Sequence, residues 1–135
     1  MAFSLKTLSD YAPLVLRVVG GVIFGVHGYQ KLFGGMEQFA STIAAVNLPP
    51  YFAQVGALVE FVGGILLVLG LLTRLASFLL AGQMAVAIVK FHIFYLHQRL
   101  VQGFEFPLAM FAMMLALFLI GSGAWSLDRK MFGWS

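Results

Sequence analysis

The sequence predicts an all-α membrane protein: a transmembrane four-helix bundle with a short interfacial helix between the first two spans. Three observations predict this fold. Of the 135 residues, 61% are hydrophobic and only 10% are charged, whereas an ordinary soluble domain carries about 25% charged residues. The apolar residues gather in four blocks long enough to cross a bilayer. A soluble fold of this size leaves too large a share of its surface exposed to hide so many apolar side chains.

The four apolar blocks are expected to form spans at residues 13–33, 52–72, 75–96 and 107–124, within a single domain covering residues 1–135. Backbone groups in lipid must find partners within their own segment, so blocks of this length are expected to be helices. The first block is too long for a cleaved signal peptide and ends without small residues, so we expect a retained span. Only Thr73 and Arg74 separate the second and third blocks, which predicts a tight antiparallel helix pair.

Residues 34–51, between the first two spans, carry apolar side chains at three- and four-residue spacing: Met36, Phe39, Ala40, Ile43 and Val46. This spacing indicates a short helix lying in the membrane interface. The run Asn47-Leu48-Pro49-Pro50 is expected to end it. The alternative is a loop with incidental apolar residues.

Basic residues near the span ends predict the orientation. With four spans, both termini lie on one side, which carries the larger basic group: Lys6, Arg17, Arg74, Arg129 and Lys130. The opposite side carries three: Lys31, Lys90 and Arg99. This asymmetry favours both termini in the cytoplasm. The formal charge of +3 then fits lipid headgroups rather than nucleic acid. The expected partners are the lipid bilayer and either other membrane-protein subunits or further copies of the chain.

Glu60 lies near the middle of the second block, where an ionisable group is costly unless it faces a partner inside the protein. Small residues share its helix face: Gly56, Gly63 and Gly64. Because small residues allow close helix contact in lipid, Glu60 is expected to point into a helix–helix interface.

Other polar residues fall at a similar depth in the bundle. At about 1.5 Å of rise per residue, His27, Glu60 and Lys90 each lie roughly 10 Å below the same membrane surface. His92 lies slightly nearer to that surface. The candidate polar pocket therefore comprises His27, Lys31, Glu60, Lys90 and His92. A second polar cluster, Arg17, Arg74 and Asp128, is expected at the cytoplasmic end.

Three interpretations of the candidate polar pocket remain open. Glu60 can be a structural counter-ion paired with Lys90, Lys31 or His27. The pocket can instead be a ligand, quinone or proton site. A haem held by His27 and His92 is conceivable, but no further ligand pattern supports it, and no metal site is expected. The chain has no cysteine, which excludes thiol–disulfide chemistry by the chain itself.

A series of motifs extends over nearly the whole chain. It begins in the first span with Arg17, Gly21, Phe24, His27-Gly28 and Lys31-Leu32-Phe33-Gly34. It continues with Phe39, Pro49, Glu60, Gly63-Gly64, Gly70, Arg74, Met84, Ala87 and Glu105, and it closes with Gly121, Gly123 and Trp125-Ser126-Leu127-Asp128. In this order and spacing the motifs are specific, and from about Leu14 to Asp128 the sequence resembles the DoxX family of small bacterial membrane proteins.

The resemblance implies a four-helix transmembrane bundle in the bacterial inner membrane and a link to oxidoreductases. Members of the family are associated with thiosulfate:quinone oxidoreductase and with thiol-stress complexes. One family ending reads Gly-Pro-Gly-Arg, where this chain has Gly121-Ser122-Gly123-Ala124. The loss of that arginine puts an ion pair at the cytoplasmic end in doubt.

Two main hypotheses follow. In the first, the chain is a membrane subunit of a quinone-linked oxidoreductase system, where Lys31 or His27 donates a hydrogen bond to a quinone carbonyl and Glu60 relays or balances the proton. No intrinsic cofactor is expected. In the second, the chain is a non-catalytic accessory or assembly subunit, and Glu60 is purely structural. Transport of a small solute is a weaker third hypothesis, because four spans make a narrow pathway.

Overall fold

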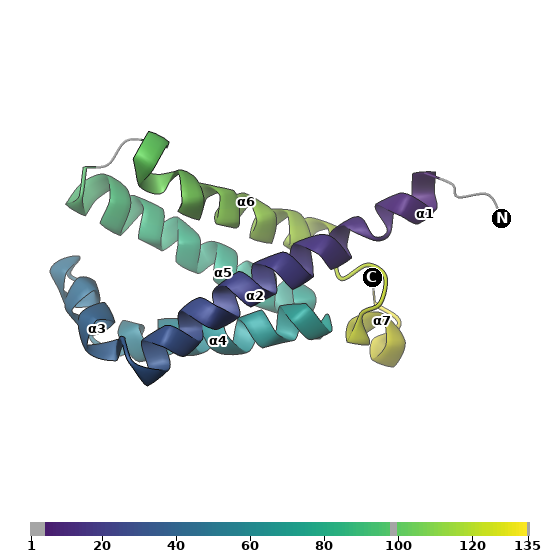
Figure 1. Ribbon diagram of the computed structural model, residues 1–135, viewed down its shortest axis with the longest axis horizontal. Helices are drawn as coiled ribbons and strands as arrows, with labels where there is room; N and C mark the ends of the chain where they lie inside the picture. Colours follow the sequence, from purple (N-terminus) through teal and green to yellow (C-terminus); the bar gives the residue numbers. More distant parts are fainter. Residues whose placement is uncertain (1–4, 98–99, 135) are drawn as a thin grey trace.

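The computed structural model describes residues 5–97 and 100–134, and all regular secondary structure in these residues is helical (Figure 1). The helices in chain order are α1 (Leu5–Ser9), α2 (Ala12–Phe33), α3 (Met36–Ala45), α4 (Tyr51–Leu69), α5 (Thr73–Val86), the π-helices η1 (Ala87–Tyr95) and η2 (Leu100–Phe104), α6 (Glu105–Ile120) and α7 (Leu127–Phe132). Arg99, expected among the basic residues on the α3 side, lies outside the described residues.

Local sequence explains where the long helices begin and end. Pro13 occupies the first turn of α2, where its fixed φ suits a helix and no N–H is required. Gly70 ends α4 in a left-handed conformation (φ 71°), and its N–H donates to the carbonyls of Leu66 and Leu67. Gly121 ends α6 at φ 87°, so the chain turns away after Ile120.

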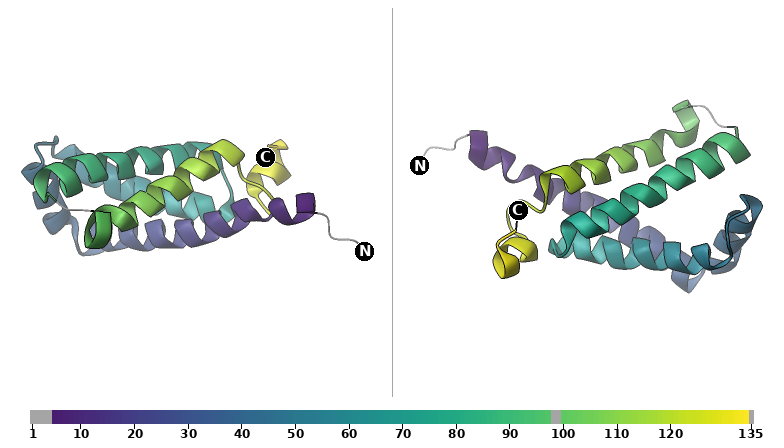
Figure 2. Two further views of the ribbon diagram at one scale, coloured as in Figure 1. Left: turned by 90° about the horizontal axis from the view of Figure 1, so that it is seen from above. Right: turned by 180° about the vertical axis from the view of Figure 1, so that it is seen from behind.

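The long helices pack as two pairs. α2 lies along α4, and α5 lies along α6, while the contact between the consecutive helices α4 and α5 joins the pairs (Figures 1 and 2). The buried core lies between these helices and comprises Phe24, Leu67, Ala76, Leu80, Ala81, Met110, Met114 and Leu117. The predicted antiparallel pairing of the second and third apolar blocks is confirmed by the contact of α4 with α5. The connection is residues 70–72, whereas Thr73 and Arg74, predicted to separate the blocks, begin α5.

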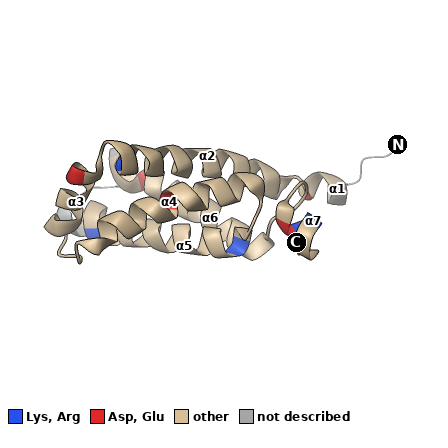
Figure 3. Cartoon of the chain, turned by 90° about the horizontal axis from the view of Figure 1, so that it is seen from below, with Lys and Arg blue, Asp and Glu red and all other residues tan. Residues whose placement is uncertain are grey.

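The outer surface of the helices is apolar along most of their length. Large side chains such as Val15, Leu58 and Leu119 are at least half exposed, as expected for a surface that faces lipid. Three helical stretches are long and apolar enough to cross a membrane: Thr7–Phe33, Tyr51–Leu69 and Thr73–Ile93. Charged residues lie mainly toward the two ends of the helices (Figure 3). α6 is apolar but shorter, at 16 residues, so a fourth crossing stays a prediction.

Helix α3 occupies the segment between the first two spans, where the spacing of apolar residues predicted a helix. It contacts α4 and, to a smaller extent, α2, and none of its own residues is fully buried. The prediction of a helix here is confirmed, and the alternative of a loop is wrong. α3 lies at the opposite end of the bundle from α7 (Figure 1).

Candidate functional site

The carboxylate of Glu60 is the centre of a buried polar cluster that joins three helices. Its oxygen Oε1 accepts hydrogen bonds from Lys31 Nζ of α2 and from Gln83 Nε2 of α5, each at 2.9 Å. Its oxygen Oε2 lies 2.9 Å from the same Lys31 ammonium as an ionic contact. The side chain of Glu60 is 3% exposed and that of Lys31 is 27% exposed. We call these three residues the Glu60 cluster.

Helix α3 covers the Glu60 cluster from the end of the bundle. The Phe39 ring of α3 lies 4.1 Å from Lys31 Nζ, measured to the ring centroid, in a cation–π contact. Gly56, one turn before Glu60, lies beside this cover, and a Cβ atom there would be in ordinary van der Waals contact with Gln83 Nε2 at 3.4 Å and with the Phe39 ring at 3.5 Å. The ammonium is therefore held between a carboxylate and an aromatic face.

Close approach of α2 and α4 brings Lys31 within reach of Glu60. A Cβ atom on Gly64 would lie 2.6 Å from the Gly21 carbonyl oxygen and 2.7 Å from the Gly25 Cα, so the two backbones touch. Gly28 lies against the backbone of Phe61 in the same way. The prediction that glycines on this face allow close helix contact, with Glu60 facing inward, is confirmed.

The other residues of the predicted pocket have different surroundings. His27 has an exposed side chain, and its ring stacks on Phe106 of α6 with 6.3 Å between centroids. The side chain of Lys90 is exposed on η1. His92 is half-buried, and its ring stands edge-on to Phe91 at 5.2 Å. No three His, Asp or Glu side chains within residues 5–97 and 100–134 come together as metal ligands would.

Sequence reasoning missed Gln83 and the cover by Phe39. Gln83 lies on α5 about two turns before Lys90, and it was the only polar amide in an otherwise apolar stretch. That isolation was an available signal, because an amide within a span usually hydrogen-bonds to a neighbouring helix. Phe39 was recognised as an apolar residue of the interfacial helix, but not as a partner of Lys31.

The second predicted cluster lies at the α7 end, and Arg17 is its buried centre. Arg17 is 0% exposed. Its guanidinium donates hydrogen bonds to the carbonyl oxygens of Leu67 (3.3 Å), Ala124 (2.8 Å) and Trp125 (3.2 Å). These bonds tie α2 to the end of α4 and to the segment that follows α6.

Asp128 completes this cluster from α7. Its two carboxylate oxygens accept hydrogen bonds from the backbone N–H groups of Leu72 (2.7 Å) and Thr73 (2.9 Å), which begin α5. Its own N–H donates to the Gly70 carbonyl at 2.9 Å, and its charge acts on Arg17 across the junction. A buried carboxylate at a helix N-terminus satisfies N–H groups that the helix leaves unpaired.

Arg74, the third residue predicted for this end, has an exposed side chain. A different arginine makes an ion pair here: Arg129 donates to both oxygens of Asp10, at 2.8 Å and 2.9 Å. The hydrogen bonds that Arg129 donates to Asp10 raise the pKa of Arg129 above its ordinary value. The end of the bundle therefore contains an ion pair although the family's Gly-Pro-Gly-Arg ending is absent.

Lys31→Met is expected to destabilise the protein by about 1–2 kcal/mol, because it leaves the Glu60 carboxylate buried with Gln83 as its remaining hydrogen-bond donor. The expected loss of stability is smaller than for a fully buried ion pair because Lys31 is partly exposed. Unfolding in mixed micelles measures the loss. The double variant Lys31→Met/Glu60→Leu removes both charges and is expected to recover stability; a double variant no more stable than the single one would contradict an ion-pair cluster.

Comparison with known proteins agrees with the helical membrane architecture. A family model described as DoxX matches residues 12–93. The chain is 35% identical to "Putative oxidoreductase CatD" of Bacillus subtilis, over 91% of this chain and 89% of the relative. It is 33% identical to an uncharacterized protein of Haemophilus influenzae (95% and 98% covered) and 29% identical to "Inner membrane protein YqjF" of Escherichia coli (94% and 97%). No solved structure matches the chain.

Proposed function

We propose that this chain, which belongs to the DoxX family of membrane proteins, is a membrane subunit of a quinone-linked oxidoreductase system. The name of the Bacillus subtilis relative describes an oxidoreductase, which supports the redox part of the proposal. The chain has no cysteine and is expected to hold no intrinsic redox cofactor. Electrons would therefore reach the quinone from a partner subunit.

The observation that carries the proposal is the position of the Lys31 ammonium. It is anchored 2.9 Å from both oxygens of Glu60, yet the side chain keeps about a quarter of its surface exposed. On its other side stands the Phe39 ring of α3, a helix without fully buried residues. An incoming carbonyl oxygen can replace that ring contact and accept a charge-assisted hydrogen bond from Lys31.

A bound quinone supplies two carbonyl oxygens that take up protons when a partner reduces it with two electrons. The residues of this chain would hold and position the proton. Lys31 Nζ would donate to one carbonyl oxygen and pass it a proton on reduction, and water would return a proton to the neutral amine that remains. The second carbonyl oxygen would take its proton from water, and Glu60 would keep the Lys31 side chain oriented through their 2.9 Å contact. Gln83 would hold the Glu60 carboxylate in place through its 2.9 Å hydrogen bond.

The membrane placement that we propose has four crossings, formed by α2, α4, α5 with η1, and α6, in the bacterial inner membrane. α3 would lie in the interface on one side. Both termini would face the cytoplasm, because the α7 end carries Arg74, Arg129 and Lys130. Short helices such as α6 can cross where flanking residues reach the interface and the bilayer thins locally.

Quinone binding tests this function directly. We expect the purified protein in detergent to bind a short-chain menaquinone analogue saturably in a calorimetric titration. Lys31→Met is expected to weaken this binding about ten-fold, as loss of a hydrogen bond from a charged donor does. Lys31→Arg, which keeps the charge and the donor, is expected to retain most of it.

Lys90→Met is the matched control, because Lys90 is another lysine on the same half of the bundle with an exposed side chain. It is expected to bind like the wild type. Absence of saturable binding by the wild-type protein, or an equal loss in Lys90→Met, would contradict the quinone site.

A second candidate function is that of a non-catalytic accessory or assembly subunit. The existing contacts of Glu60 favour it, since its Oε1 atom already accepts hydrogen bonds from Lys31 and Gln83 and its Oε2 atom is in ionic contact with Lys31. Two measurements distinguish the functions: an accessory subunit is expected to purify in mild detergent in a fixed ratio with a larger membrane protein, and it is expected to bind no quinone. A wild-type protein that purifies alone as a monomer would argue against this candidate.

A further inference from the structure

We propose that the hollow beside α7 binds the phosphate headgroup of an anionic membrane lipid. The hollow has a volume of about 410 Å³ and is lined by Leu69, Trp125, Ser126, Leu127, Arg129 and Lys130. Helix α7 lies at the opposite end of the bundle from α3, whose Phe39 contacts Lys31 of the Glu60 cluster (Figure 1). The inference is therefore independent of quinone binding.

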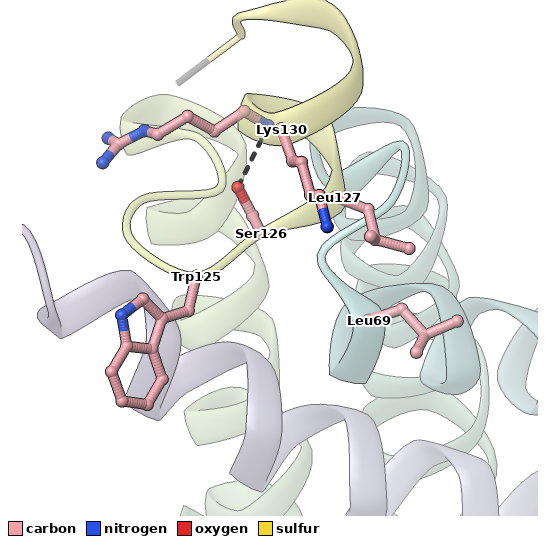
Figure 4. A pocket seen from close by; sticks show the side chains of 6 residues that line it. Leu69, Trp125, Ser126, Leu127 and Lys130 are labelled. Carbon is pink, nitrogen blue, oxygen red and sulfur yellow. Dashed lines mark hydrogen bonds between the residues drawn. The ribbon is translucent and has the colours of Figure 1, made fainter.

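The lining of the hollow has an apolar part and a cationic part. Leu69 ends α4 and Leu127 begins α7, and the Lys130 side chain reaches from α7 toward both (Figure 4). Trp125 lies on the other side of Ser126 in the same view. A phospholipid has a matching arrangement, because its anionic phosphate is joined to an apolar glycerol ester and acyl chains.

Lys130 gives the hollow its unbalanced positive charge. Arg129 is already paired with Asp10 through two hydrogen bonds. The neighbouring carboxylate of Asp128 is turned away from the hollow and is occupied by the N–H groups of Leu72 and Thr73. No described carboxylate lies within ion-pair distance of Lys130 among the salt bridges of residues 5–97 and 100–134. An anion is the complementary ligand.

The position of the hollow favours a lipid over a free anion. It opens where α4 ends and where the long apolar helices meet the α7 segment (Figure 4). Trp125 and Trp134 are both exposed at this end, and exposed tryptophans are typical of the headgroup level of a membrane. Leu69 is about half exposed, so it is available to an acyl chain beside the phosphate.

The test compares three ligands, and it compares substitutions of two lysines, one at each end of the bundle. The purified wild-type protein is titrated in detergent with phosphatidylglycerol, with phosphatidylcholine and with inorganic phosphate, and bound lipid is counted by native mass spectrometry. We expect phosphatidylglycerol to be retained and the other two not. Lys130→Gln is expected to weaken retention about five-fold, which corresponds to roughly 1 kcal/mol for one basic residue at an anionic surface. Lys90→Gln removes the same charge at the far end and is expected to retain the lipid.

Four results would overturn the proposal: equal retention of phosphatidylcholine, equal binding of inorganic phosphate, wild-type retention by Lys130→Gln, or an equal loss in Lys90→Gln. The unfolding midpoint without added lipid checks that Lys130→Gln is folded, and a wild-type midpoint is expected because Lys130 is exposed. Raising the salt concentration is expected to weaken retention, since the attraction is screened within a Debye length.

Discussion

Gly28→Ala is expected to destabilise the protein by about 3 kcal/mol, at the upper end of the range for overpacking. A Cβ atom on Gly28 would press against the backbone nitrogen of Phe61 and lie 2.7 Å from its Cα atom. A backbone cannot turn aside as a side-chain end can, so α2 and α4 must separate. Lys31 lies one turn further along α2, and Glu60 is adjacent to Phe61. The separation is therefore expected to open the Glu60 cluster as well.

Gly25→Ala is the matched control for this prediction, on the same helix and one turn away. A Cβ atom on Gly25 would meet no other atom within 4 Å. Alanine is also a better helix former than glycine, so this variant is expected to unfold at or slightly above the wild-type midpoint. Unfolding in mixed micelles compares the two. Equal losses of stability in Gly25→Ala and Gly28→Ala would show that the tight α2–α4 contact does not depend on Gly28.

Arg17→Met is expected to destabilise the protein by about 3–5 kcal/mol, because buried acceptors left without a donor cost about 1–3 kcal/mol each. Three carbonyl oxygens, those of Leu67, Ala124 and Trp125, lose their donor. Because two of the three carbonyls belong to the segment after α6, we expect this segment to loosen first. Hydrogen exchange in residues 121–134 is expected to accelerate before global unfolding.

Arg129→Met is the control for Arg17→Met, since it removes the other arginine bound at the α7 end. Arg129 and Asp10 are both substantially exposed, and exposed ion pairs contribute little to stability. The unfolding midpoint of Arg129→Met is expected to stay close to that of the wild type. A wild-type midpoint and unchanged exchange in Arg17→Met would contradict the role of Arg17 as the centre of this junction.

Depth along the helix axes could be predicted from the sequence, and this explains what sequence analysis found. Counting residues from the span ends placed His27, Glu60 and Lys90 at one level, and the spacing of small residues placed Glu60 on the inner face of α4. Lys31 was one of three possible partners of Glu60, and in the structure it is the one in contact. Apolar periodicity likewise predicted α3.

Rotation about the helix axis is what the sequence could not provide. Lys90 and His92 were placed at the level of Glu60 by assuming regular α-helical geometry. The chain instead changes from α-helix to π-helix at Ala87, and π-helical bonding runs from residue i to i+5. The extra residue in each turn changes which face every later side chain occupies. Lys90 lies after this change from α-helix to π-helix, which apolar spacing does not predict, and its side chain is exposed.

The end of the fourth apolar block shows a second limit. Apolar composition continues to Ala124, but α6 ends at Ile120. Residues 121–126 turn back, so that the Ala124 carbonyl accepts from Arg17 and its N–H donates to the Asp10 carbonyl at 3.0 Å. These partners are more than 100 residues apart in the chain. Long-range hydrogen bonds of this kind leave no local pattern in the sequence.

The carbonyl contacts of Arg17 also have a consequence for biogenesis. Arg17 enters the membrane with the first span, whereas Ala124 is made 107 residues later. At translation rates of about 5–20 residues per second, this interval lasts roughly 5–20 s. Until Leu67 is made, 50 residues after Arg17, the guanidinium lacks all three acceptors, and afterwards it still lacks two, so we expect it to stay hydrated at the membrane surface. The first helix can therefore reach its final depth only when the last segment of the chain has been synthesised.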